Sequence, residues 1–350
     1  MRLKLPLQRL ALPALLALSA ALAGCNTVVM NPAGDIARQQ ADLITTSTVL
    51  MLLICVPVIA LTLLFAWRYR ARHNAAGAGD NAGASYEPDW DHSTKLELLI
   101  WGAPLLIIIA LGAITWISTH QLDPYRPLSR IDAKRALPSN VKPLEVQAVA
   151  MDWKWLFIYP EQGVAVVNEL ALPVDRPVRF TMTASTVMNS LAIPALAGQV
   201  YAMPGMQSQL HAIVNQAGVY DGGSGQYSGD GFSAMRFKMH ALQPADFDGW
   251  VQQARAGGAT LDRAAFLKLD EPSKKHPVTR YAQVESGLFD AAVNRCVDRS
   301  KMCMGQMMAI DEQGGGGKAG LASLTRQTWR GGERAVVAGL CTPANPEGKL

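Results

Sequence analysis

The sequence predicts a membrane protein of mixed α and β structure: a hairpin of two transmembrane helices, then a β domain and a helical C-terminal region. The chain has 350 residues, of which 49% are hydrophobic and only 17% charged, and this is too apolar for an ordinary soluble protein of its size. The apolar residues are concentrated in clusters near the N-terminus. Beyond them, short apolar stretches alternate with turn signals, as is typical of β-strands. The net charge is only +4. We therefore expect no nucleic-acid partner.

Residues 1–24 are interpreted as a secretory signal peptide. Three basic residues precede an apolar run over residues 10–22, which is too short to cross a bilayer. The run ends in Leu22-Ala23-Gly24-Cys25, which is similar to the bacterial lipoprotein box, whose cysteine is acylated, for example with palmitate, and becomes the mature N-terminus. Cys25 is therefore the predicted lipidation site, and ordinary cleavage after small residues is the alternative. An acyl chain alone binds membranes only marginally, so true spans should dominate attachment.

Two further clusters, residues 43–67 and 96–118, are predicted transmembrane helices. Each is near the roughly 20 apolar residues that cross a bilayer. Pro57 and Pro104 interrupt them, which a helix packed against other helices tolerates. The alternative is two buried helices of a soluble core, which the lengths disfavour.

The basic residues predict the orientation of this hairpin. Residues 68–95 between the spans carry Arg68, Arg70, Arg72 and Lys95, whereas the preceding segment, residues 25–42, has only Arg38. By the positive-inside rule the loop is cytoplasmic and both ends are periplasmic. A lipidated Cys25 must also lie outside. We therefore expect an inner-membrane protein whose residues from 119 onward lie in the periplasm.

Residues 119–242 are predicted to form a β-sandwich or barrel, because many short strands follow at regular spacing. Residues 243–295 have helix-like spacing and carry no obvious catalytic group, and residues 296–350, with their run Gly314 to Gly317, are predicted to be a flexible tail. The expected strands are residues 146–151, 153–159, 164–172, 178–182 and 210–214.

The stretch from Tyr227 to Met239 resembles the copper-binding loop of subunit II of haem-copper oxidases, with nearly every ligand replaced. That family places a Cys, a second Cys four residues later, a His eight later and a Met eleven later, and a further His upstream. Serine is a hard donor, phenylalanine has no lone pair, and arginine stays protonated, so soft copper coordination is lost. We predict no metal site here. The degenerate ligand positions are Asn189, Ser228, Asp230, Phe232, Arg236 and Met239.

Other segments support the resemblance. Met151 to Tyr159 resembles the family's aromatic segment, and Pro204-Gly205 keeps its turn while neighbouring charges are lost. Residues 272–289 resemble the C-terminal aromatic region of subunit II of cytochrome bo-type ubiquinol oxidases. The chain is therefore similar to that family, which implies a cupredoxin-like sandwich and a complex that oxidises ubiquinol, reduces oxygen to water and moves protons.

The same resemblance implies that this chain binds no cofactor. Haem and copper would lie in subunit I, and subunits III and IV would be further partners. Cytochrome c is water-soluble and needs an extramembrane relay, whereas ubiquinol arrives within the lipid and can reduce haem directly. The missing metal thus indicates a change of electron donor, with the fold kept to support assembly of subunit I.

Glu97, at the cytoplasmic start of the second span, has two interpretations. A carboxylate near a helix N-terminus is favoured by the helix dipole. Ionisable residues at membrane depth also mark proton paths, and family members carry a similar Glu at the mouth of a proton channel of subunit I. We take proton entry as the hypothesis.

Of the five cysteines, Cys296 and Cys303 are the closest pair. A disulfide is permitted in an oxidising compartment, and we rank it ahead of adventitious copper binding with the surrounding methionines. Two rival functions stay open: a copper-binding cytochrome c oxidase subunit II, and a lipid-anchored periplasmic cupredoxin or assembly factor.

Overall fold

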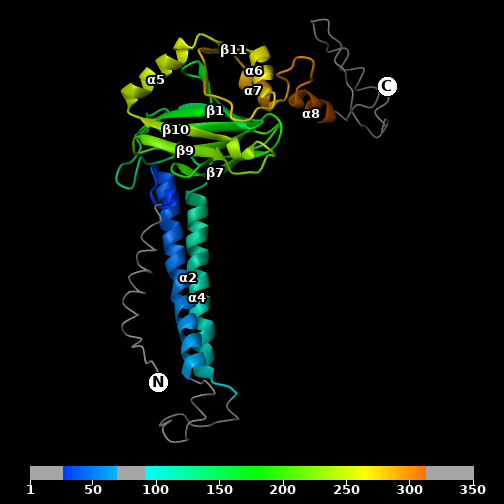
Figure 1. Cartoon of the computed structure of the whole chain (residues 1–350). Coiled ribbons are helices and arrows are strands. Elements are labelled where there is room, and N and C mark those ends of the chain that lie inside the picture. Colours follow the sequence, from blue (N-terminus) through cyan, green and yellow to red (C-terminus); the bar gives the residue numbers. More distant parts are fainter. Residues whose placement is uncertain (1–26, 69–90, 313–350) are drawn as a thin grey trace, which may run out of the picture. The chain divides into compact units, whose positions relative to one another are not determined.

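The computed structural model describes residues 27–68 and 91–312 (Figure 1). The chain divides into two compact units, one of Gln39–Arg126 and one of Met1–Arg38 with Pro127–Leu350. Cys25, most of the predicted cytoplasmic loop and the tail after residue 312 lie outside the described residues.

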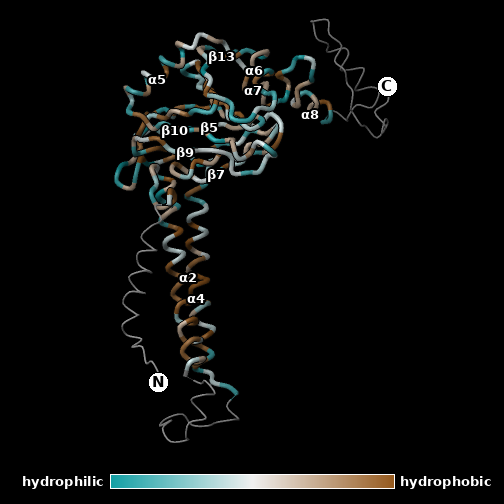
Figure 2. The backbone as a smooth tube through the Cα atoms, viewed as in Figure 1, coloured by the Kyte–Doolittle hydropathy of each residue, from teal (hydrophilic) through white to brown (hydrophobic). Residues whose placement is uncertain are grey.

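The helical unit consists of α2 (Asp35–Arg68) and α4 (Thr94–Gln121). Both are long and apolar enough to cross a membrane, and the brown stretches in Figure 2 mark their hydrophobic residues. Their side chains are exposed along the spans. The core helix of a soluble protein would bury those side chains, so the exposure favours lipid contact. Pro57 and Pro104 lie inside the two helices without ending them.

The first turn of α2 belongs to the other unit, where residues 33–37 are inserted between two loops. The amides of Ala33 and Gly34 donate to the carbonyl of Ala195 at 2.8 and 3.0 Å. Only glycine fits at position 34, because a Cβ there would lie 2.5 Å from the Ile213 carbonyl oxygen. Asp35, which is buried, accepts two hydrogen bonds from Arg130 at 2.8 and 3.1 Å. This anchoring explains why the helix begins before the predicted span.

Two sheets pack face to face, which confirms the predicted β-sandwich. Aromatic rings of the two sheets meet in the core, where Phe157 and Phe237 have ring centroids 4.9 Å apart. The first sheet has the order β12-β3-β2-β1-β5-β8, and the second has the order β4-β10-β9-β6-β7. The first sheet contains β1 (Leu144–Met151), β2 (Lys154–Tyr159), β3 (Val164–Val167), β5 (Pro177–Ala184), β8 (Ser208–Ile213) and β12 (Thr279–Tyr281). The second contains β4 (Glu169–Pro173), β6 (Asn189–Ile193), β7 (Ala197–Ala202), β9 (Gly218–Ser224) and β10 (Arg236–Leu242).

The predicted strand 164–172 is two strands, because the chain changes sheets at Asn168. This residue has φ 57°, a left-handed conformation that asparagine tolerates better than most residues. Its side chain accepts a hydrogen bond from the Trp155 amide at 2.9 Å and donates to the His276 carbonyl at 2.8 Å. β3 therefore pairs in the first sheet and β4 in the second.

The C-terminal region packs on the sandwich. Helices α6 (Arg263–Asp270) and α7 (Leu288–Val293) cover β1, β2 and β3, and Phe266, Leu288 and Phe289 form a cluster with Met151 and Ile158. β2 is consequently buried on both faces. The rest of the region consists of α5 (Pro244–Ala256), a small sheet of β11 (Thr260–Leu261) with β13 (Gln283–Val284), and β12, which extends the first sheet.

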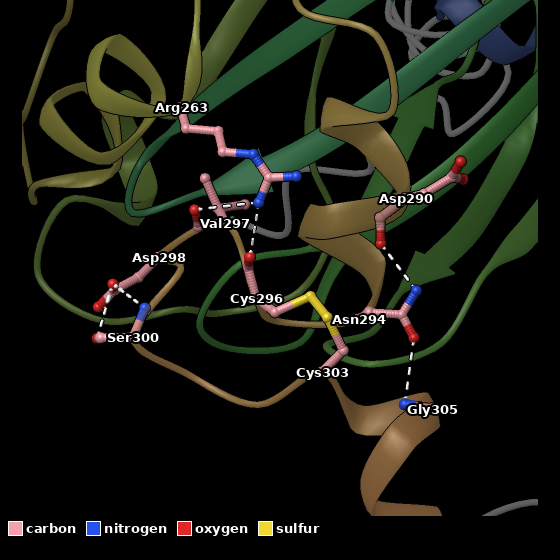
Figure 3. The surroundings of a disulfide bond; sticks show 9 residues. All are labelled: Arg263, Asp290, Asn294, Cys296, Val297, Asp298, Ser300, Cys303 and Gly305. Atoms are coloured by element: carbon pink, nitrogen blue, oxygen red, sulfur yellow. Dashed lines mark hydrogen bonds between the residues drawn. A yellow bond between two sulfur atoms is a disulfide. The ribbon is translucent and has the colours of Figure 1, made fainter. Parts of the chain in front are cut away.

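Residues 296–312 hold a disulfide and a helix, where the sequence predicted a flexible tail. Cys296 and Cys303 are bonded, as the first-ranked alternative proposed (Figure 3). The bond precedes α8 (Met304–Glu312). The amide of Met304 donates to the Asn294 carbonyl at 2.9 Å, and Arg263 Nη1 donates to the Cys296 carbonyl at 2.9 Å. These contacts fix the start of α8 against the domain.

Candidate functional site

The degenerate ligand positions lie on two inner strands of the second sheet, β6 and β10, and on the loop between β9 and β10. Asn189 opens β6, Ser228 and Asp230 lie in the loop between β9 and β10, Phe232 is in a short 3-10 helix (Phe232–Ala234), and Arg236 and Met239 are in β10. β9 pairs with both β6 and β10, so this sheet brings the segments that carry the six positions together.

The Asn189 side chain forms hydrogen bonds with other protein groups. It is buried, its Nδ2 donates to the Val187 carbonyl at 3.1 Å, and its Oδ1 accepts from Ser224 Oγ at 3.1 Å. Ser224 Oγ in turn lies 3.4 Å from the Gln226 amide, which donates to it. An amide in this arrangement positions the β6 and β9 strand ends, and it offers no soft donor.

Trp153 packs beneath the loop. It lies in the turn between β1 and β2 with φ 64°, and its Nε1 donates to the Ser228 carbonyl at 3.0 Å. A Cβ on Gly231 would lie 2.3 Å from the indole ring, so the ring rests directly on the loop backbone. Ser228 Oγ is buried and has no hydrogen-bond partner within the described part of the chain.

The remaining positions differ in exposure. Asp230 is exposed and pairs with Lys274, whose ammonium lies 5.9 Å from the Trp153 ring centroid. Arg236 is exposed, and its Nε donates to the Ser233 carbonyl at 3.3 Å. Phe232 packs edge-on against Tyr227, with ring centroids 5.6 Å apart. Met239, which alone keeps the donor type of the copper-binding pattern, is fully buried in β10.

The donor set at these positions is an amide, a hydroxyl, a carboxylate, an aromatic ring, a guanidinium and one thioether. Soft copper sites need thiolate and imidazole donors. In residues 27–68 and 91–312, no group of three or more His, Cys, Asp or Glu side chains could hold a metal ion. The polar side chains of Asn189, Asp230 and Arg236 pair with protein groups, and one thioether cannot hold a dinuclear centre.

Lys154 is a buried charged residue that the sequence patterns did not predict. It is fully buried, and its ammonium donates to the Glu271 carbonyl at 2.7 Å, to Ser273 Oγ at 2.8 Å and to the Asp152 carbonyl at 3.3 Å. Burial lowers the pKa of the Lys154 ammonium, while burial raises the pKa of the neighbouring Asp270 carboxyl. A lysine within an aromatic run on a strand was the available signal, since buried lysines need partners.

Glu169 is a second buried charge that joins the C-terminal region to the sandwich. Its Oε1 accepts from Trp250 Nε1 at 2.5 Å, and both carboxylate oxygens accept from Arg280 Nη2 at 2.8 and 2.9 Å. Trp250 is on α5 and Arg280 on β12, whereas Glu169 opens β4. Hydrogen bonds from Lys154, Asn168 and Glu169 thus hold the C-terminal region on the sandwich. Lys274 of that region also pairs with Asp230 in the loop between β9 and β10.

Glu97 belongs to the helical unit. It is in the first turn of α4, and its Oε2 is 3.6 Å from His92 Nε2. Its amide donates to the Ser93 carbonyl at 2.9 Å, and half of its side chain is exposed. The described helices give it only this one ion pair, which leaves the carboxylate accessible from the predicted cytoplasmic end.

Known families and proteins match most of the chain. The family described as the periplasmic domain of cytochrome c oxidase subunit II matches residues 160–242, and the COX aromatic rich motif matches residues 255–300. Subunit 2 of cytochrome bo(3) ubiquinol oxidase of Pseudomonas putida is 47% identical over 78% of this chain and 82% of that protein. The corresponding subunit of Pseudomonas aeruginosa is 48% identical over 77% and 76%, and ubiquinol oxidase subunit 2 of Acetobacter aceti is 46% identical over 78% and 83%.

Proposed function

Because this chain belongs to the family of subunit 2 of the cytochrome bo(3)-type ubiquinol oxidases, we propose that it serves its oxidase without a copper centre of its own. It is a subunit of the ubiquinol oxidase complex of aerobic respiration, with two candidate spans and a periplasmic domain. The observation that carries the proposal is the donor set at the six degenerate positions, five of which offer no soft ligand.

The electron donor explains why the metal is dispensable. Cytochrome c delivers electrons from the aqueous phase, and its oxidases therefore need a relay outside the membrane. Ubiquinol is held in the lipid, so its electrons can enter haem in subunit I without crossing the periplasmic domain. Haem and copper then belong to subunit I, and subunits III and IV complete the set of partners.

The periplasmic domain keeps a structural role in this proposal. Trp153, Lys274 and the Asn189–Ser224 hydrogen bond hold the loop that copper would otherwise cross-link. Such a loop has a fixed shape without metal, as an interface for assembly with subunit I requires. The C-terminal region supplies Lys274, so the extra region and the altered loop act together.

Attachment through Cys25 is part of the proposal. The support is the Leu-Ala-Gly-Cys tetrapeptide together with the anchoring of residues 33–37 in the periplasmic domain. A lipid on Cys25 in the inner membrane would tether the segment that leads into this anchor. Mass spectrometry of the purified subunit would detect the diacylglyceryl and acyl groups on Cys25.

Electron-donor preference tests the proposal. The purified oxidase should turn over rapidly with ubiquinol-1 and should show only background oxygen uptake with reduced cytochrome c. A cytochrome c oxidase assayed in parallel provides the positive control for cytochrome c. Rapid oxidation of reduced cytochrome c by the present enzyme would contradict the proposal, because electrons would then enter through the periplasmic domain.

Glu97 is proposed to assist proton entry at the cytoplasmic surface. Glu97→Gln removes the titratable carboxyl and keeps the shape of the side chain. We expect about a tenfold loss of oxygen reduction and proton uptake in the assembled enzyme, equivalent to about 1.4 kcal/mol on the barrier. Stopped-flow proton uptake and oxygen consumption measure this effect.

Asp91→Asn is the matched control, since it neutralises a nearby exposed carboxylate outside α4. It should leave both rates unchanged. His92→Gln removes the ion pair with Glu97 and keeps the Glu97 carboxyl. It should change oxygen reduction and proton uptake little if the carboxyl itself takes up the proton. Unchanged rates in Glu97→Gln would contradict a role in proton entry and would leave only the interaction of this carboxylate with the helix dipole.

A further inference from the structure

Methionines gather around the turn of Pro204 and Gly205. Met203 and Met206 occupy the first and last positions of this turn, which is closed by a hydrogen bond of 3.3 Å from the Met206 amide to the Met203 carbonyl. Gly205 has φ 74°, as the third residue of a type II turn requires. A Cβ on Gly205 would lie 2.5 Å from the sulfur of Met304. The Met304 thioether therefore rests on the turn at Gly205.

The start of α8 holds this sulfur in place. Met304 follows Cys303, whose disulfide with Cys296 fixes the chain (Figure 3). The Asn294 carbonyl accepts from the Met304 amide at 2.9 Å, and Asn294 Oδ1 accepts from the Gly305 amide at 3.3 Å. Met307 and Met308 lie three and four residues further along the helix, so they share the face of Met304.

The turn brings Met203 and Met206 close together along the backbone, next to the Met304 sulfur. The ends of a β-turn have Cα atoms within about 7 Å of each other, and a methionine side chain has three flexible torsions. Met203, Met304 and Met307 are partly buried, while Met206 and Met308 are 56% and 59% exposed. Exposed thioethers beside a fixed one can close on a small ion without moving the backbone.

Thioether sulfur is a soft, uncharged donor that selects Cu(I) over harder divalent ions. Zn²⁺ and Cu²⁺ prefer carboxylate and imidazole ligands, and the described residues contain no group of three or more His, Cys, Asp or Glu side chains that could hold a metal ion. Uncharged ligands also leave the charge of the ion uncompensated. A site of this composition therefore binds Cu(I) reversibly.

We propose that Met203, Met206 and Met304 form a surface site for one Cu(I) ion, with Met307 and Met308 as additional ligands. The site is separate from the degenerate positions and uses none of them. Bound Cu(I) has a filled d shell and no paramagnetic signal, so this site and a dinuclear copper centre are spectroscopically distinct.

The test uses the complete purified oxidase under anaerobic conditions with ascorbate, which generates Cu(I). Cu(I) is titrated against bicinchoninate as competitor, and copper beyond the resident amount is counted per complex. We expect one additional Cu(I), no additional Zn²⁺, and at least tenfold weaker Cu(I) binding in Met203→Leu/Met206→Leu/Met304→Leu. Leucine has a similar volume to methionine, which limits the effect on packing.

Met206→Leu alone keeps the proposal testable if the triple variant does not assemble. Its side chain is exposed, so folding is not at risk, and binding should already weaken about tenfold. Met30→Leu, which alters an exposed methionine elsewhere, should bind Cu(I) as the unaltered oxidase does. No uptake by the unaltered oxidase, or uptake that the methionine variants leave unchanged, would overturn the proposal and indicate an adventitious ion only.

Discussion

Replacing Glu169 by alanine should destabilise the periplasmic domain by about 3 kcal/mol, because it leaves the buried Trp250 N–H and the half-buried Arg280 guanidinium without their acceptor. Glu169 is 8% exposed and accepts hydrogen bonds from Trp250 and Arg280. Both donors come from the C-terminal region, so the variant should also loosen α5 and β12. Urea unfolding of the purified chain, followed by tryptophan fluorescence, measures the loss, and limited proteolysis locates it.

Asp221→Ala is the matched control for Glu169→Ala. The Asp221–Lys238 pair is exposed on both sides, with side-chain exposures of 76% and 59%. Such pairs contribute about 0.2–1 kcal/mol, and this variant should therefore stay close to the unaltered protein. If Glu169→Ala unfolded at the same urea concentration as Asp221→Ala, the C-terminal region would not depend on this buried charge.

Restoring the copper ligands should give the periplasmic domain a dinuclear copper site. The required changes are Asn189→His, Ser228→Cys, Phe232→Cys and Arg236→His, with Asp230 and Met239 kept. The spacing of these positions already follows the copper-binding pattern, and the second sheet brings their segments together. Soft thiolate and imidazole donors then replace groups that cannot bind copper.

We expect this variant to take up two copper ions per chain and to turn purple, as measured by elemental analysis and visible spectroscopy. The control variant carries the other three substitutions but keeps Phe232, because one thiolate should not support the dinuclear centre. A folded four-residue variant that stayed colourless with excess copper would show that the loop backbone no longer has the copper-binding geometry.

Much of the fold could be predicted from patterns along the chain. The two spans appear as long apolar runs, and alternation marks the strands from β1 to β5. The division at Asn168 could not be predicted in the same way, because apolar residues continue on both sides of it. The change of sheet depends on hydrogen bonds to Trp155 and His276, which are distant in the sequence.

The C-terminal elements illustrate the same limit. β12 has three residues and is too short for a periodic signal, so it is recognised only by its pairing with β3. The helix α8 follows a disulfide that restrains a segment of otherwise weak pattern. Local sequence does not contain these long-range restraints.

The sequence pattern predicted the candidate loop but did not reveal the groups that pack against it. The spacing from Ser228 to Met239 identified the loop, and the residue types indicated the loss of soft ligands. The groups that pack against the loop, Trp153 and Lys274, come from the β1–β2 turn and the C-terminal region. Only the folded chain brings these three segments together.

Copper content and electron paramagnetic resonance of the purified oxidase would show whether this chain holds a copper centre. We expect the resident copper to be accounted for by subunit I, with no mixed-valence dinuclear copper signal and no purple absorption from this chain. A stoichiometric dinuclear copper signal that is lost together with this subunit would contradict the account, because it would require thiolate and imidazole ligands in this chain that the six degenerate positions do not supply.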